Sequence, residues 1–267
     1  MLGTLELLAR DGSAVGRPKP ARVSHAATHI GRREDNQDAV LADDEARLYI
    51  VADGLGGRPG GAVASKLAVE EISRVVRRCS DTTSEDTVQL RIDLHRSPEE
   101  SLLEHAVRSA HRAVIRRRDA EYAEMATTVA ALHLTGGVAV IAHVGDSRIY
   151  RLRRGLLELL TRDHSLVNER QDAGTPLPPE EHESHSHIVM RALGVLRSAE
   201  PDLRCVAAQS GDTFLLCSDG LHGVLPETRI AELLGRAEPE LAAERLVWSA
   251  YAANSQDNIS AVVVRVP

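Results

Sequence analysis

The segment from Arg47 to Ala64, RLYIVADGLGGRPGGAVA, constrains the possible folds more than any other part of the sequence. Five consecutive apolar residues, 48–52, predict a buried strand that ends at Asp53. Five glycines follow before a helical pattern starts at Ala62, and glycine permits tight turns and a close approach of the backbone to a ligand. Two kinds of site fit this arrangement: phosphate bound by backbone N–H groups at a helix start, or a hard cation bound by Asp53 and a glycine carbonyl.

Composition and charge exclude several classes of protein. A chain of 267 residues with 43% apolar content can bury one large core, and its net charge of −7 with scattered basic residues argues against a nucleic-acid-binding stripe. Three cysteines without a CxxC pair argue against a disulfide framework or zinc knuckle and favour a reducing compartment. No apolar run reaches the roughly 18 residues of a membrane span, and Glu6 interrupts the apolar start, unlike a signal peptide. We therefore expect a cytoplasmic protein without a membrane or nucleic-acid partner.

The chain divides into an N-terminal extension or tail, residues 1–22, and one domain, residues 23–267, because a linker containing Pro18 and Pro20 separates them. Strands are predicted at 23–28, 48–52, 128–134, 138–144, 149–152, 156–160, 202–207, 213–218 and 259–266. Helices are predicted at 62–79, 99–120, 226–236 and 240–253, with His105 and His111 on an exposed face of the second.

The order of these elements decides between the two kinds of site. Residues 128–160 form consecutive hairpins joined by glycine-containing turns, whereas a dinucleotide-binding half-fold alternates strands and helices around a parallel sheet. The dinucleotide interpretation of the glycines is therefore weak. The long segment 161–191 has no sustained period and predicts a flap, and its histidines His182, His185 and His187 are interpreted as solvated flap residues in preference to zinc ligands.

Five aspartates stand at the ends or starts of separate predicted strands: Asp38, Asp53, Asp146, Asp219 and Asp257. Any one of them could cap a turn, but five carboxylates brought together repel one another unless cations neutralise them. An all-oxygen set without His or Cys favours Mg²⁺ or Mn²⁺ over zinc.

Eight motifs then occur in an order that resembles the PPM (PP2C) family of metal-dependent Ser/Thr protein phosphatases, in its bacterial branch. They are REDNQD (33–38), ADGLGG (52–57), ATTV (126–129), VGDSR (144–148), DHSLVNE (163–169), RALG (191–194), CSDGL (217–221) and DNIS (257–260). The resemblance covers residues 23–267. It implies an α+β fold, a four-layer αββα sandwich of two antiparallel sheets flanked by helices.

The resemblance also implies roles for particular residues. Asp53 would bridge two Mn²⁺ or Mg²⁺ ions; Asp219 and Asp257 would complete one site, and the Gly54 carbonyl and Asp38, through water, would serve the other. Asp146 matches the position of a third, weaker ion, and Arg33 matches the phosphate-binding arginine. Asp53, Asp219, Asp257 and Arg33 would form the catalytic set for attack of a metal-activated water on phosphoserine or phosphothreonine.

Three features limit or extend this reading. Leu55 stands where many eukaryotic relatives have a histidine proposed as general acid, and Ser186, His187 and Met190 depart from the usual flap residues, which affects substrate preference. Cysteine-dependent phosphatase chemistry needs an arginine six residues after the thiolate, and Cys79, Cys205 and Cys217 lack one. The expected partners are phosphorylated proteins and bacterial Ser/Thr kinases, and the expected state is a monomer; the alternative is an inactive phosphoprotein-binding regulatory module.

Overall fold

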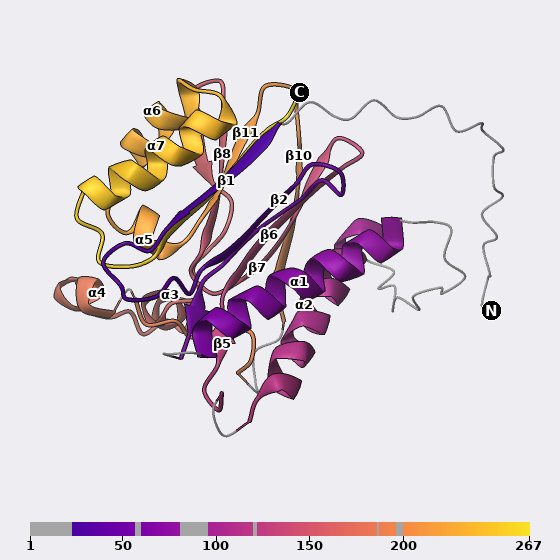
Figure 1. Ribbon diagram of the computed structural model, residues 1–267. Coiled ribbons are helices and arrows are strands. Elements are labelled where there is room, and N and C mark those ends of the chain that lie inside the picture. The colour runs from indigo at the N-terminus through magenta and orange to yellow at the C-terminus, as the bar shows by residue number, and fades with distance from the viewer. Residues whose placement is uncertain (1–22, 57–59, 81–95, 120–121, 186, 196–199) are drawn as a thin grey trace.

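Two antiparallel sheets pack face to face, with helices on both outer sides, in the computed structural model (Figure 1). The structure describes residues 23–56, 60–80, 96–119, 122–185, 187–195 and 200–267. The predicted extension, residues 1–22, lies outside the described residues. The four-layer αββα sandwich expected from the motifs is confirmed.

Each main sheet has five strands, all paired antiparallel. The first sheet runs in the order β1 (Ser24–His29), β12 (Ile259–Arg265), β11 (Thr213–Cys217), β8 (Arg148–Arg153) and β9 (Leu156–Leu159). The second runs in the order β10 (Asp202–Ala207), β7 (Val138–Val144), β6 (Val129–Thr135), β3 (Leu48–Ala52) and β2 (Ala39–Asp43). A small pair, β4 (Gly54–Leu55) and β5 (Ala126–Thr127), continues beyond the second sheet.

Strands that are buried on both faces explain the continuous apolar runs in the sequence. In β3, Leu48 and Ile50 face the outer helices, while Tyr49 and Val51 face the other sheet. Side chains alternate between the two faces of a strand, so a strand between two packed layers must be apolar at every position. The core therefore has three layers: one between the two sheets, and one between each sheet and the helices that cover it.

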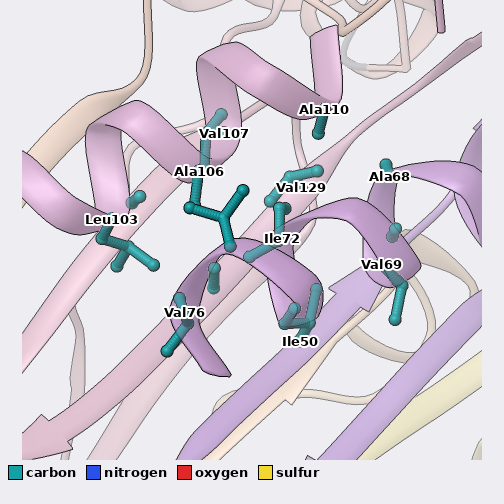
Figure 2. Close-up of a cluster of buried hydrophobic side chains, with 14 of the residues drawn as sticks. Ile50, Ala68, Val69, Ile72, Val76, Leu103, Ala106, Val107, Ala110 and Val129 are labelled. Carbon is teal, nitrogen blue, oxygen red and sulfur yellow. The ribbon is translucent and has the colours of Figure 1, made fainter. Parts of the chain in front are cut away.

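Helices α1 (Gly60–Ser80) and α2 (Pro98–Arg117) cover the second sheet. Ile72 and Val76 of α1 pack with Leu103 and Val107 of α2 over the strand residue Ile50, as Figure 2 shows. A capping box begins α2: the Ser97 hydroxyl accepts the Glu100 N–H, and the Glu100 carboxylate accepts the Ser97 N–H.

Helices α6 (Glu227–Gly235) and α7 (Pro239–Ala252) cover the first sheet. Ile230 of α6 and Leu246 of α7 pack on Tyr150 and Val263 of that sheet. Three short helices complete the described part: α3 (Leu166–Asp172), α4 (Pro179–His185) and α5 (Asp219–His222). Within the described residues, no helix combines the length and apolar character needed to cross a membrane.

Some predictions differ from the structure. His111 is buried, because it lies on the same side of α2 as Leu103, Val107 and Val114, and its Nδ1 accepts the Gly194 N–H at 3.2 Å. The prediction of an exposed face for His111 is therefore wrong. The predicted flap contains α3 and α4, and a bridge between Ser165 and Val189 closes its base. Helices this short carry too few apolar positions to show a period in the sequence.

Candidate metal and phosphate site

The five aspartates gather at one end of the sandwich. Asp38 directly precedes β2, Asp53 lies between β3 and β4, and Asp146 lies between β7 and β8. Asp219 opens α5 immediately after β11, and Asp257 stands two residues before β12. The register places these strand ends together, because Ala39 pairs with Ala52, Cys217 with Ala261, and Arg148 with Cys217.

A pocket of about 650 Å³ opens at this end of the sandwich. Six of the seven predicted site residues line it: Arg33, Asp53, Gly54, Asp146, Asp219 and Asp257. Asp38, the seventh, lies beneath, where its Oδ2 accepts a hydrogen bond of 2.8 Å from the Ser218 hydroxyl. Leu55 also lines the pocket, in place of the histidine of many eukaryotic relatives.

Two carboxylate oxygens in this cluster are buried without a hydrogen-bond partner among the described residues. They are Oδ1 of Asp38 and Oδ1 of Asp219. A buried polar atom without a partner costs free energy, and more so when it carries charge. These two atoms are therefore where the cluster lacks a positively charged or hydrogen-bonding group.

The pKa values of four aspartates in the cluster are raised, which also indicates a lack of compensating positive charge. Burial raises the pKa of Asp38 from 3.8 to about 7, with the charges of Asp219 and Asp257 adding to it. Burial, followed by the charge of Asp219, raises the pKa of Asp146 to about 7. The pKa of Asp53 is raised well above its ordinary value by burial and then by Asp38. The pKa of Asp219 is also raised, mainly by burial and then by the charge of Asp257. Such carboxyls cannot all ionise near neutral pH unless cations join them.

Arg33 reaches the cluster from the turn between β1 and β2. Its Nη2 forms an ion pair of 2.6 Å with Oδ2 of Asp257, and its side chain is 58% exposed. An exposed guanidinium at the mouth of an acidic pocket can bind an incoming anion through two parallel hydrogen bonds.

Several residues that were not predicted as site residues hold the aspartates in place. Nδ2 of Asn258 donates to the carbonyl oxygens of Ile30 and Asp35, both at 2.8 Å. Oδ1 of Asn258 accepts the Gln37 N–H at 2.8 Å, so this one amide joins the loop of Arg33 and Asp38 to the start of β12. Asn258 and Ser218 each adjoin a predicted ligand within a motif, and that adjacency is the only sequence signal for them.

The Thr127–Thr128 pair positions the other side of the pocket. The Asp53 carbonyl accepts both the Thr127 hydroxyl and the Thr128 N–H at 2.8 Å, and the Asp53 N–H donates to the Thr128 hydroxyl at 2.9 Å. His222, half-buried at the end of α5, has its Nε2 3.0 Å from the Asp146 carbonyl oxygen, so it supports the loop of that aspartate.

Gly54 allows three segments to meet beside Asp53. A Cβ on Gly54 would lie 2.3 Å from the Gly61 carbonyl oxygen and 2.7 Å from that of Gln37. Any side chain there would force β4, the start of α1 and the loop before β2 apart. The glycine-rich turn thus serves close packing around a carboxylate.

The donor set fits a hard divalent cation. It consists of oxygens only, it includes two buried carboxylate oxygens without partners, and its carboxyls hold raised pKa values. In the described part of the chain, no group of three or more Cys, His, Asp or Glu side chains is arranged so that it could hold a metal ion by itself. Water and backbone carbonyls would therefore have to supply part of the coordination, as hard cations commonly allow.

Two of the three flap histidines contact backbone carbonyls of their own segment. On α4, His182 is exposed and His185 is half-buried. Each has a ring nitrogen 2.9 Å from a backbone carbonyl oxygen of its own segment, that of Leu177 and of Glu181 respectively. His187 lines the pocket from the flap, and Ser186 lies outside the described residues. The interpretation of these histidines as flap residues therefore agrees with their positions.

An α+β sandwich with an acidic, all-oxygen pocket and an arginine at its mouth defines a class of metal-assisted phosphoryl hydrolases. The chain belongs to the protein phosphatase 2C family, whose model matches residues 26–253. The protein is therefore a serine/threonine protein phosphatase of the PP2C type.

Individual relatives agree with this membership. The serine/threonine phosphatase stp of Listeria monocytogenes is 35% identical over 237 residues, which cover 86% of this chain and 89% of that protein. The crystal structure of the Mycobacterium tuberculosis phosphatase PstP/Ppp superposes with a TM-score of 0.76 at 32% identity, covering 91% of this chain and 97% of that one. A PstP catalytic domain solved with two manganese ions superposes with a TM-score of 0.75, also at 32% identity, covering 91% and 96%.

Proposed function

We propose that this phosphatase hydrolyses phosphoserine and phosphothreonine in proteins with two divalent cations held by its aspartate cluster. The observation that carries the proposal is the convergence of five aspartates at one end of the sandwich. Four of them line one pocket with Arg33, Asp38 lies next to them, and two carboxylate oxygens of the cluster are buried without partners. The manganese pair in the PstP catalytic domain supports the number and kind of ions.

In this proposal each site residue has a defined task. Asp53 would contribute to both cation positions. Asp219 and Asp257 would complete one, and the Gly54 carbonyl and, through water, Asp38 would serve the other. Asp146 would serve a third, weaker position. When bound, the cations supply the Lewis acidity that activates a water molecule for attack on phosphorus.

Arg33 binds and orients the phosphoryl group in the proposed mechanism. Its guanidinium group forms an ion pair with Asp257, which holds the group at the pocket mouth while it stays exposed to solvent. An incoming phosphate monoester offers several oxygens to the same fork, so the group can be held in line with the attacking water.

The physiological substrates in this proposal are phosphoproteins made by bacterial Ser/Thr kinases. The relatives named serine/threonine phosphatase support this substrate class. The cytoplasmic location and the monomeric state stay predictions, as does the boundary between an extension and a domain at residue 23.

Phosphate release from a phosphothreonine peptide tests the proposal directly. We expect turnover with Mn²⁺ or Mg²⁺, none with EDTA, and none from the Asp219→Ala variant with either metal. Asp35→Asn is the matched control, because Asp35 lines the same pocket without belonging to the predicted ligand set. Calorimetric titration with Mn²⁺ gives a second readout: Asp219→Ala should bind fewer ions than the wild type, and Asp35→Asn the same number.

Two results would contradict the proposal. Metal-independent turnover would remove the role of the aspartate cluster. Retained phosphopeptide binding by a folded protein that releases no phosphate with either metal would favour the alternative, a phosphoprotein-binding regulatory module.

A further inference from the structure

A second concave surface lies along β1, where α7 passes beside this strand (Figure 1). It encloses about 370 Å³ and is lined by residues 25–29 of β1 and by Glu244, Val247 and Trp248 of α7. We refer to these eight residues as the β1 groove. It is separate from the pocket of the aspartate cluster, with which it shares no lining residue.

The β1 groove follows the open edge of a sheet. Among the described residues, β1 is the terminal strand of the first sheet and pairs only with β12. Backbone N–H and C=O groups on the open edge of such a strand can pair with an additional extended segment. Five residues of strand correspond to about 17 Å, enough to hold a peptide of five or six residues.

The side chains of β1 leave a depression that could take every second side chain of such an added segment. Ala27 packs toward the α7 layer, whereas Ala26 packs toward the space between the sheets. Because sides alternate along a strand, His25 and His29 lie on the same side as Ala27. A small residue between two larger ones leaves a depression beside Val247 and Trp248.

Two rings that line this groove, His29 and Trp248, contact each other and the neighbouring ring of Tyr251. The His29 ring centroid lies 4.6 Å from that of Tyr251 and 5.1 Å from that of Trp248, and the two larger rings meet edge to face at 5.9 Å. Arg32 adds a cation–π contact, with its Cζ 5.7 Å from the Tyr251 centroid. Despite these contacts Trp248 is 57% exposed. A tryptophan that is ordered yet exposed is typical of binding hot spots.

One end of the β1 groove lies close along the chain to the phosphate site. β1 ends at His29, whose Nδ1 accepts the Gly31 N–H at 2.9 Å, and Arg33 of the phosphate site follows two residues later. Ile30, between the ring cluster and the pocket, is 39% exposed. A polypeptide whose phosphoresidue contacts Arg33 therefore has its flanking residues within reach of β1.

We propose that the β1 groove is a docking site for the phosphoprotein substrate. It would bind an extended segment flanking the phosphoresidue, paired with the open edge of β1 and placing apolar or aromatic side chains at alternate positions against Ala27 and Trp248. The proposal rests on the proposed function, because it assigns the groove to the substrate of the aspartate pocket. The groove and the pocket are neighbours, because Arg32 contacts the Tyr251 ring and the next residue, Arg33, lines the pocket; this closeness is the reason for choosing the substrate chain as the occupant.

Kinetics with substrates of different length test this docking. The substrates are p-nitrophenyl phosphate, a phosphothreonine peptide with two residues on each side, and one with eight on each side that carries Val and Phe at alternate positions. We expect kcat/KM for the long peptide to exceed that for the short one about tenfold, equivalent to about 1.4 kcal/mol. In Trp248→Ala the KM for the long peptide should rise until its kcat/KM equals that of the short peptide. The kcat for the peptides and the hydrolysis of p-nitrophenyl phosphate should not change.

Leu241→Ala is the matched control, since Leu241 is an exposed apolar residue of the same helix, 43% exposed, outside the groove. It should retain the full advantage of the long peptide. Trp248 is the only tryptophan of the chain, so its fluorescence reports occupancy of the groove. The long peptide should shift the emission and the short peptide should not, with or without metal.

The outcomes separate this proposal from the proposed function. Equal kcat/KM for both peptides in the wild type, or an advantage that survives Trp248→Ala, would overturn the docking site. So would a change in sedimentation from dimer to monomer on Trp248→Ala, which would assign the groove to a second copy of the chain. An emission shift on removal of residues 1–22, without any response to the long peptide, would assign it to those residues. A failure to hydrolyse any substrate would contradict the proposed function, and the fluorescence response would still decide the docking site.

Discussion

Replacing Asp38 by asparagine removes one charge from the aspartate cluster and leaves its shape almost unchanged. The asparagine can still accept the hydrogen bond that the Ser218 hydroxyl donates to Asp38. It also replaces a carboxylate whose Oδ1 is buried without a partner by a neutral amide, which removes the cost of burying a charge there. In metal-free protein the substitution should therefore stabilise the fold, whereas a substitution at a purely structural aspartate would destabilise it.

The magnitude follows from the pKa of Asp38, which rises from 3.8 to about 7 on folding. The folded state then binds its proton more tightly than the unfolded state, so this residue lowers the free energy of unfolding as pH rises from about 4 to about 7. One pKa unit corresponds to about 1.4 kcal/mol, which sets a ceiling of about 4 kcal/mol. Asp38 is partly exposed and shares its proton with neighbours, so we expect Asp38→Asn to gain about 2 to 4 kcal/mol at pH 8.

Urea unfolding in EDTA at pH 5 and pH 8 measures the effect. The gain should be larger at pH 8 than at pH 5, and Asp172→Asn, an exposed carboxylate paired with Arg162, should stay within about 0.5 kcal/mol of the wild type. With Mn²⁺ the order should reverse, because the wild type binds the ion more tightly and gains more stability from it. An Asp38→Asn protein that is less stable than the wild type at pH 8 in EDTA would refute the reasoning.

Three further changes test other parts of the structure. Arg33→Lys keeps the charge but loses the fork, so kcat/KM for a phosphopeptide should fall about tenfold, and Arg33→Ala should cost about a hundredfold, as steady-state kinetics would measure. His143 is buried, and burial lowers its pKa to about 3, so the folded state resists its protonation and stability is lost as pH falls below about 6.5. His143→Asn should therefore lose about 2 kcal/mol less than the wild type between pH 7 and pH 5 in urea unfolding, and equal losses would contradict this. Ile72 is fully buried between α1, α2 and the second sheet, so Ile72→Ala should lower the free energy of unfolding by about 2 to 5 kcal/mol without changing kcat of the folded enzyme.

Local patterns in the sequence predicted most of the secondary structure. The strand at 48–52 has the predicted bounds, and so does the strand at 202–207. Such patterns work because strand and helix periods are set by neighbouring residues. They fail where a segment is short, as in α3 and α4, or where a polar residue occupies a core position, as His111 does in α2.

The sequence by itself determined the kinds of residue at the site: aspartates at strand ends, glycines after Asp53 and one arginine, in an order that is specific to a family. Only the tertiary structure decided which groups hold these residues. Asn258 bonds the Ile30 carbonyl across 228 positions of the chain, and β1 pairs with β12 from the other end of the domain. It also decided that Trp248 faces outward beside an open strand edge. Contacts of this range depend on how sheets and helices pack, and no local pattern encodes which distant partner a side chain will meet.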